Sequence, residues 1–361
     1  MTRIDDVARL AGVSTATVSR ALRGLPTVTE ATRLRVLDAA AQLGYIASPS
    51  ASRLAGGKTR AVAVVVPRIT RWFFSTVVEA AEDTLQEAGY DLLLYNLGGR
   101  ENARERMLHT ASLRHRVDAL MLVATPLRRT DFAAISALGM PGVTVSSGTG
   151  VPGWPSIRID DVAAARTATG HLIGLGHRRI AHISGNSGEE LAFTAHLDRR
   201  RGYREALVTA GLTPDPALDV EGDFTIAGGG LATAELLRRG PVPTAIFAAC
   251  DEMALGAIAV LRQAGLRVPA DVSVIGIDDH DVARVVGLTT VAQPAAEQGR
   301  LAAGTLLGPL AAGTPPGPLA AGTPPGPLAA GTPPAAAPTD TVTLPTRLVV
   351  RESTAPPRET G

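Results

Sequence analysis

Residues 14–20, STATVSR, carry side chains that can hydrogen-bond to nucleic acid. Arg20 can donate two hydrogen bonds to the edge of a guanine, and Thr15 and Ala16 are small enough to contact bases or a thymine methyl group in a major groove. Three neighbouring hydroxyls suit backbone phosphates: Ser14, Thr17 and Ser19. We expect this set to bind DNA if one exposed helix face presents it.

The residues around this segment predict the helices that would present it. Ser14 can cap a helix that runs to about Leu22. A first helix can begin after Thr2, with Asp5 completing a capping box, and end at Gly12. A tight glycine turn between two short helices is typical of a helix-turn-helix, although a three-helix bundle without DNA function remains an alternative on these residues alone.

A third helix is predicted over about residues 30–43, between a Thr29 cap and Gly44. Four of its residues are expected to face the other two helices: Leu34, Leu37, Ala40 and Ala41. The predicted core of the head is therefore small and aliphatic.

Composition bounds the class of protein. With 361 residues, 45% of them hydrophobic, the chain can form two or three domains with sizeable cores. The single cysteine, Cys250, fits a reducing compartment. Neither an N-terminal apolar run nor an apolar stretch of about 18 residues is present, so we expect no signal peptide and no membrane span.

Charge is distributed unevenly. Residues 1–60 contain nine Lys and Arg residues against four acidic residues, a formal charge of +5, whereas the whole chain carries +1. A basic head joined to a mildly acidic body favours a polyanionic partner for the head.

From residue 60 onward, apolar runs alternate with amphipathic helices. Buried strands are predicted at AVAVVVP (61–67), YDLLLYN (90–96), VDALMLVA (117–124), PGVTVS, RIAHIS, TAIFAA and DVSVIGID. This alternation is typical of doubly wound parallel sheets, which bind ligands beyond the carboxyl ends of their strands.

The motifs and their order resemble the lac repressor family of bacterial regulators. The similarity covers DVARLAGVSTATVSRALRG, the segment VTEATRLRVLDAAAQLGYIASPSASRLAGGKTRAVAVVVP and most of the body. It implies a two-lobed body like that of periplasmic sugar-binding proteins, with the ligand between the lobes. The implied fold is therefore multidomain, with an all-α helix-turn-helix head and an α/β body of doubly wound parallel sheets.

The same resemblance gives a role to residues 47–59. In the family this segment is a hinge helix that enters the minor groove when two subunits bind operator DNA. Leu54 matches the leucine that wedges into the central base step, which bends the duplex at a cost of about a few kcal/mol. Ala51 would let the two hinges approach closely, and Arg53 would contact phosphate; a flexible linker is the alternative.

Several body residues match family positions that contact the effector. They are Phe73 and Phe74 after the first strand, Arg199 in DRRRGYREAL, Phe224 in GDF and Asp278 in VIGIDDHD. Together they suit a polyhydroxylated ligand, because charged groups can bind hydroxyls and aromatic rings can cover apolar sugar faces. Alternatives are a surface salt bridge for Arg199, a core role for Phe224 and a helix cap for Asp278.

Two positions depart from the family pattern. Cys250 stands where many sugar-binding members carry asparagine, and Ser146 stands where several carry aspartate. Both changes remove hydrogen-bonding capacity, so the effector is expected to be less polar than a typical hexose or bound differently.

The sequence GPLAAGTPP occurs three times between residues 308 and 334 and is predicted to form an exposed loop. The expected domains are thus a head over 1–46, a hinge over 47–59 and an effector-binding and dimerisation body over 60–361. Within the body we expect one lobe over 60–159 and 292–307 and another over 160–291 and 339–353.

The predicted function is that of a ligand-responsive, sequence-specific transcription regulator, with a repressor as the expected form. Double-stranded operator DNA, a carbohydrate effector and a second copy of the chain are the expected partners, in the cytoplasm and on the nucleoid. We expect no cofactor, metal or membrane partner and no enzymatic activity, since no nucleophile is coupled to a base. A sugar-binding protein of transport or chemotaxis is the alternative, which leaves the basic head unexplained.

Overall fold

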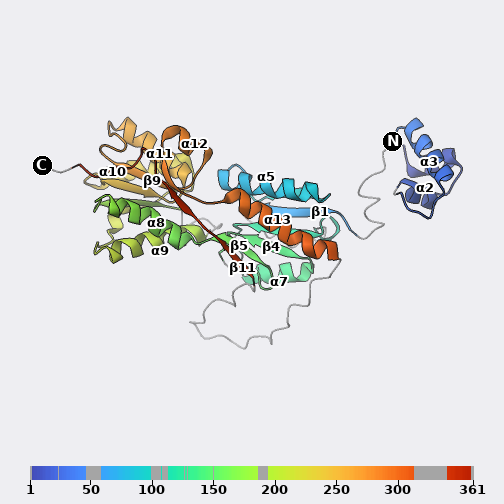
Figure 1. Ribbon diagram of the computed structural model, residues 1–361, viewed down its shortest axis with the longest axis horizontal. Coiled ribbons are helices and arrows are strands. Elements are labelled where there is room, and N and C mark those ends of the chain that lie inside the picture. The colour runs from blue at the N-terminus through green and yellow to red at the C-terminus, as the bar shows by residue number, and fades with distance from the viewer. Residues whose placement is uncertain are drawn as a thin grey trace, which may run out of the picture. The chain divides into compact units, whose positions relative to one another are not determined.

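The computed structural model describes residues 2–22, 24–45, 58–98, 107, 113–125, 127, 129–148, 150–185, 194–312 and 340–358. The chain divides into two compact units. The first contains the helical head, residues 2–45, and the second contains the α/β body (Figure 1).

The head consists of three helices packed around one small core. They are α1 (Ile4–Ala11), α2 (Thr15–Leu22) and α3 (Glu30–Gln42). Gly12, with φ at 65°, turns the chain between α1 and α2, in a left-handed conformation that glycine adopts without steric penalty. Ser14 caps α2, because its Oγ accepts a hydrogen bond from the Thr17 backbone N–H at 3.2 Å.

The cap predicted for α1 was wrong by one residue. Arg3, rather than Thr2, is the N-cap, and Asp6, rather than Asp5, completes the capping box by accepting a bond from the Arg3 N–H at 2.9 Å. The Thr2 hydroxyl instead donates to the Leu43 carbonyl oxygen at 3.1 Å, which ties the start of α1 to the end of α3.

The predicted inner face of α3 was also partly wrong. Val36, Ala39 and Ala40 are buried, whereas Leu34 and Leu37 are 59% and 45% exposed. Apolar residues occur almost all around this helix, so their spacing fits more than one face. The face with the smaller side chains packs inward and lets three short helices approach closely.

The body contains two six-stranded sheets, one in each lobe. The N-lobe sheet has the order β11-β5-β4-β3-β1-β2, and its paired strands are all parallel. Its strands are β1 (Ala61–Val66), β2 (Asp91–Asn96), β3 (Ala119–Val123), β4 (Gly142–Val145), β5 (Ser156–Ile159) and β11 (Thr341–Leu344). Strands β1, β3 and β4 are fully buried, as expected for a sheet covered on both faces.

The C-lobe sheet has the order β12-β10-β9-β8-β6-β7, with only β12 antiparallel among its described strands. Its strands are β6 (Ile180–Ser184), β7 (Asp219–Glu221), β8 (Ala245–Ala248), β9 (Ser273–Asp278), β10 (Thr289–Ala292) and β12 (Arg347–Val349). The two sheets therefore have the doubly wound architecture expected from the alternating pattern.

Helices cover the sheets and form the outer layers. In the N-lobe α5 and α13 lie side by side, and in the C-lobe α8 packs on α9 and α10 packs on α11, on opposite sides of the sheet (Figure 1). The body helices are α5 (Trp72–Glu87), α7 (Arg129–Leu138), α8 (Asp161–Gly174), α9 (Thr194–Thr209), α10 (Ile226–Arg239), α11 (Asp251–Gln263), α12 (Asp281–Val286) and α13 (Ala295–Ala312). Two short 3₁₀ helices are η1 (Leu113–His115) and η2 (Pro216–Leu218).

The chain passes between the lobes three times. The crossings follow β5, β10 and β11, and the deep-red segment in Figure 1 is the last of them. The assignment of all of residues 339–353 to the C-lobe was therefore wrong. Thr341–Leu344 pairs with β5 in the N-lobe, and only Arg347–Val349 joins the C-lobe sheet. Pro345 and Thr346 separate the two strands and mark the change of sheet.

The predicted boundary between helix and repeat loop was wrong as well. Helix α13 continues to Ala312 and includes Pro309, so it contains the first five residues of the first GPLAAGTPP copy. Leu310 is only 5% exposed and packs into the N-lobe core, which offsets the hydrogen bond that a proline removes from a helix. Residues 313–339, which include the other two copies, lie outside the described residues.

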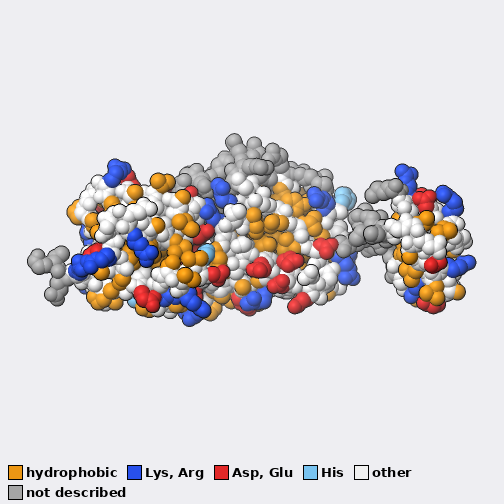
Figure 2. All heavy atoms as spheres, turned by 90° about the horizontal axis from the view of Figure 1, so that it is seen from above, with side chains coloured by type: hydrophobic (Ala, Val, Ile, Leu, Met, Phe, Trp, Pro, Cys, Tyr) orange, Lys and Arg blue, Asp and Glu red, His pale blue; other side chains and the backbone are white. Residues whose placement is uncertain are grey.

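The surface of the body carries both signs of charge. Acidic and basic side chains are interspersed over the face that Figure 2 shows. In the part of the chain that the structure describes, no helix is long and apolar enough to cross a membrane.

The repeat provides a matched test of this packing. Leu310→Ala should destabilise the body by about 2 to 5 kcal/mol, because it removes a buried leucine from the N-lobe core. Leu319→Ala, the same position in the second copy, should change stability by less than about 0.5 kcal/mol, as the exposed loop predicted from the sequence implies. Denaturant unfolding of the two variants makes the comparison. Equal losses would contradict the distinct role of the first copy.

Candidate ligand pocket and DNA-facing helix

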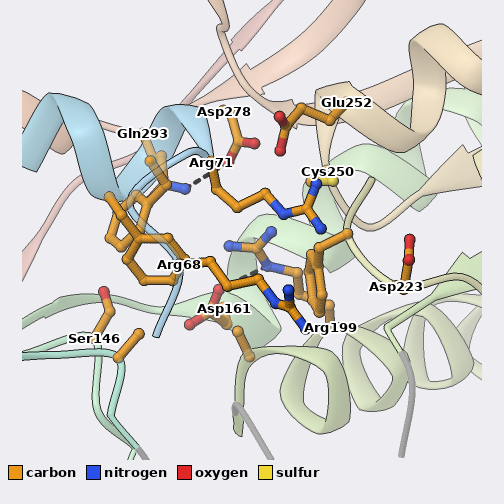
Figure 3. Close-up of a pocket in the computed structure, with 15 residues that line it drawn as sticks. Arg68, Arg71, Ser146, Asp161, Arg199, Asp223, Cys250, Glu252, Asp278 and Gln293 are labelled. Carbon is orange, nitrogen blue, oxygen red and sulfur yellow. Dashed lines mark hydrogen bonds and ion pairs between the residues drawn. The ribbon is translucent and has the colours of Figure 1, made fainter. Parts of the chain in front are cut away.

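A pocket in the body lies where the two lobes meet (Figure 3). All seven residues predicted from the sequence to contact an effector line it: Phe73, Phe74, Ser146, Arg199, Phe224, Cys250 and Asp278. The structure thus brings together residues that are up to about 200 positions apart in the chain. Whether they bind an effector remains a prediction.

Parallel topology explains the convergence. Asp278 is the last residue of β9, Ser146 follows β4, and Cys250 lies two residues after β8. The carboxyl ends of parallel strands meet at one edge of a sheet, and in this body those edges of both sheets border the pocket.

The backbone is strained at several of these strand ends. Four lining residues other than glycine have positive φ angles: Ala124 (40°), Ser146 (48°), Phe224 (58°) and Asp278 (139°). Each such conformation costs on the order of 1 to 3 kcal/mol and is typical of functional sites.

Arg199 is a buried residue and not the surface salt-bridge residue of the alternative interpretation. It is 5% exposed, and its Nε donates to Asp161 Oδ1 at 2.8 Å. A second guanidinium nitrogen donates to the Ala249 carbonyl oxygen. These two acceptors fix the guanidinium at the C-lobe wall of the pocket.

A chain of hydrogen bonds joins Asp278 to the N-lobe. Gln293 Nε2 donates to Asp278 Oδ1 at 2.6 Å, and Gln298 Nε2 donates to Gln293 Oε1 at 3.2 Å. The Ser146 hydroxyl donates to Gln298 Oε1 at 2.8 Å. Gln293 lies in the second crossing and Gln298 in α13, so this network links the two walls of the pocket through the lobe junction.

Asp278 is close to a second buried carboxyl, Asp251. Asp251 accepts hydrogen bonds from Thr290 Oγ1 at 2.7 Å and from the His280 backbone N–H at 2.9 Å. Burial, and then repulsion from Asp278, raises the pKa of Asp251 to about 8. Burial also raises the pKa of Asp278, while the neighbouring Arg199 charge opposes that rise.

Glu252 adds a third carboxyl with a raised pKa. Burial raises its pKa to about 7, against the opposing effect of the Arg71 charge, and Asp278 adds to the rise. The C-lobe wall of the pocket is therefore acidic and partly protonated near neutral pH.

The aromatic residues and Cys250 complete the lining. Phe73 and Phe74 meet edge to face with centroids 5.5 Å apart, and Phe74 also packs into the N-lobe core. Cys250 is the N-cap of α11, with its Sγ accepting from the Met253 N–H at 3.4 Å, and burial raises the pKa of its thiol well above the usual range. It offers the pocket a neutral, apolar sulfur.

The structure adds eight lining residues that the sequence interpretation missed: Arg68, Arg71, Ala124, Asp161, Ala195, Asp223, Glu252 and Gln293. Three of these residues could have been predicted from their positions in the sequence. Asp161 and Glu252 lie in the first turns of helices that follow strands, and Arg68 comes just after β1. The rule that ligands bind at carboxyl ends of strands would have included these three.

In the head, the predicted DNA-contacting residues lie on α2 and at its cap. Ser14, Thr15, Ala16 and Arg20 are exposed, and Thr17 and Ser19 are half-buried. Ser14 Oγ and Thr17 Oγ1 also hydrogen-bond to each other at 2.9 Å. The predicted minor-groove residues Ala51, Arg53 and Leu54 lie outside the described residues.

Two protein-family models match the chain in agreement with this architecture. "Bacterial regulatory proteins, lacI family" matches residues 3–48, and "Periplasmic binding protein-like domain" matches residues 169–354. The head and the pocket-bearing body thus match a DNA-binding family and a ligand-binding domain.

Known proteins are similar over most of the chain. The HTH-type transcriptional repressor CytR of Escherichia coli K12 is 36% identical over 305 residues, 84% of this chain and 88% of that protein. The regulator GalR of the same organism is 38% identical over 307 residues, with the same shares.

Solved structures give the same result. A lac repressor dimer bound to operator and the anti-inducer ONPF has a TM-score of 0.77 at 29% identity, covering 98% of this chain and 99% of that one. A complex of the regulator CelR with cellobiose has a TM-score of 0.67 at 34% identity, covering 98% and 100%.

A helix-turn-helix head joined to a two-lobed body with an interlobe pocket defines a ligand-responsive, DNA-binding transcription regulator rather than an enzyme. The chain belongs to the lacI family of bacterial regulatory proteins, so the resemblance deduced from its motifs is confirmed.

The raised carboxyl pKa values predict how stability depends on pH. Folded Asp251 keeps a proton that the unfolded chain has already released, so stability falls as pH rises through the folded pKa of about 8. Between pH 7 and 9 the body should lose about 1 kcal/mol through this group. Histidines add little, because burial lowers the pKa values of His171, His177 and His182 below this window.

Denaturant unfolding at pH 7 and pH 9 measures this loss. Asp251→Asn should reduce the pH dependence whatever its effect on overall stability, and the smaller part due to Glu252, whose pKa is raised to about 7, should remain. Asp281→Asn, which changes an exposed carboxyl on α12, should keep the wild-type slope. An unchanged slope in Asp251→Asn would refute the assignment.

Proposed function

We propose that the chain binds operator DNA through the exposed face of α2 and that a sugar-like effector in the interlobe pocket controls this binding. The convergence of all seven predicted effector residues on one pocket supports the proposal most directly. The CelR complex with cellobiose and an Enterococcus faecium family member with bound ribose agree with a carbohydrate ligand.

The DNA-binding part rests on α2. Arg20 would read a guanine, Thr15 and Ala16 would contact bases, and Thr17 and Ser19 would bind phosphates. Ser14 would act mainly by capping the helix, because its Oγ already accepts the Thr17 N–H. The Ser14 backbone lies at the amino end of α2, where the positive end of the helix dipole favours a phosphate.

Two copies are proposed to bind one two-fold symmetric operator, as the lac repressor dimer bound to operator suggests. Residues 47–59 would form the paired hinge, with Leu54 in the central base step, Ala51 at the hinge contact and Arg53 on phosphate. Under this proposal the protein acts on chromosomal DNA in the cytoplasm.

In the pocket, Asp278 and Arg199 would bind ligand hydroxyls, while Phe73, Phe74 and Phe224 would cover its apolar faces. The hydrogen bonds from Asp278 to Ser146 run through both lobes, so a ligand that competes for Asp278 changes contacts in each of them. That gives the ligand different contacts in two arrangements of the lobes, as allostery requires.

Arg20→Ala should weaken binding to a selected operator by about 1 to 3 kcal/mol and relax sequence preference, because a base contact is lost. The control is Arg35→Ala, an exposed residue of α3, which removes the same charge. Fluorescence anisotropy with operator chosen from a random DNA pool, and with non-specific DNA, measures both. If Arg35→Ala loses as much discrimination as Arg20→Ala, then α2 does not read the sequence.

Effector binding can be found by thermal unfolding of the full chain against sugars, sugar phosphates and nucleosides. A ligand at 100 times its dissociation constant stabilises by about 2.7 kcal/mol, which shifts the transition by several degrees. Asp278→Asn should reduce that shift, and the ligand should change operator affinity. A ligand that stabilises Asp278→Asn as much as the wild type binds elsewhere.

A further inference from the structure

The two walls of the pocket differ in charge. Among the described residues that line it, Arg68 and Arg71 are the charged residues of the N-lobe, and no N-lobe acid accompanies them. The C-lobe wall holds four acids and a single arginine, and these are Asp161, Asp223, Glu252, Asp278 and Arg199. A ligand that spans the pocket therefore meets a cationic wall and an acidic wall.

The two arginines are positioned by consecutive backbone elements. Arg68 follows β1, and Arg71 is the N-cap residue of α5. Both side chains extend into the pocket toward Arg199 in Figure 3. The amino end of α5 contains no acidic residue in its first turn and adds a partial positive charge on the same side.

Most of the opposing acids already have donors within the C-lobe or at the lobe junction. Asp161 binds Arg199 at 2.8 Å, and Asp278 accepts from Gln293 at 2.6 Å. Asp223 accepts from the Thr225 N–H at 3.0 Å and from the Thr225 hydroxyl. Burial raises the pKa of Glu252 to about 7, and the Arg71 charge opposes that rise. The C-lobe acids therefore interact mainly within the C-lobe and with the lobe junction.

We propose that the effector is a sugar or similar polyol that carries a phosphate or carboxylate, and that Arg68 and Arg71 bind this anionic group. Guanidinium groups bind such anions through paired, charge-assisted hydrogen bonds. The hydroxylated part would lie against Arg199 and Asp278. This inference rests on the proposed function, because it names the class of ligand for the same pocket.

The proposal also accounts for two departures from the sugar-binding pattern. Cys250 and Ser146 offer fewer hydrogen bonds to a neutral hexose, and the Ser146 hydroxyl is already bound to Gln298. Binding energy lost there can come instead from the anionic group, which a neutral sugar lacks.

The test uses the full chain and matched probes at constant ionic strength: inorganic phosphate, glucose, glucose 6-phosphate and glucuronate. The body's thermal transition and calorimetric titration report binding to the wild type, to Arg68→Met and to Arg71→Met. Arg114→Met removes an exposed N-lobe arginine outside the pocket, and Arg35→Ala removes an exposed charge from α3 of the head, which can also attract phosphate.

Glucose 6-phosphate or glucuronate should bind the wild type at least tenfold more tightly than glucose, and each pocket variant should lose at least tenfold. The two control variants should bind like the wild type. Tighter binding of glucose 6-phosphate than of inorganic phosphate supports a sugar-borne anion, and equal binding of the two overturns the sugar part. No preference for the anionic probes, or a preference that survives Arg71→Met, overturns the proposal.

Operator affinity separates this inference from the proposed function. If a neutral sugar binds, changes operator affinity, and binds the arginine variants as tightly as the wild type, then the proposed anionic group is wrong and the regulatory role stands. An anionic probe that binds through Arg68 and Arg71 and leaves operator affinity unchanged would overturn the regulatory role instead.

Discussion

The pocket depends on one requirement, which is that the Arg199 guanidinium must have an anionic partner and hydrogen-bond acceptors while it is 5% exposed. Burying an unpaired charge is strongly unfavourable, so Asp161 and the Ala249 carbonyl have to lie where they do. Asp161 begins α8, directly after the first crossing, and Ala249 follows β8. The ion pair thereby fixes the lobe junction to the end of the central C-lobe strands.

The second crossing is fixed by a neutral network with the opposite property. Its links are the neutral amides of Gln293 and Gln298 and the Ser146 hydroxyl, which can exchange partners, and it ends at the buried Asp278 carboxyl. A rigid ion pair on one side and an exchangeable network on the other is a suitable arrangement for a hinge. The adjacent carboxyl pair, Asp251 and Asp278, adds two groups whose protonation depends on the charges around them.

The sequence predicted the head and the two doubly wound sheets, because these leave strong local patterns. Glycine turns and helix caps mark α2, and uninterrupted apolar runs mark β1, β3 and β9. The identity of the pocket residues came from motif order within a family rather than from periodicity. Arg68 and Arg71 gave no such motif, and only the folded chain shows that they share a wall.

Other features of the fold could not be predicted from local sequence patterns. The inner face of α3 was ambiguous because apolar side chains surround it, and packing volume decided between Val36 and Leu37. The exchange of the last strands between sheets depends on pairing with β5 and β10, which lie far away in sequence. In α13, tertiary burial of Leu310 outweighed the low helix propensity of proline and glycine.

The positive φ angles at Ala124, Ser146, Phe224 and Asp278 have a consequence for how such a pocket evolves. Glycine would relieve the strain at each position, but it would also delete the side chain that lines the pocket. The backbone is therefore less stable at these four positions, and its bends direct the four side chains into the pocket. Since the bends belong to the scaffold, a change of residue there can alter ligand preference while the strands stay in place.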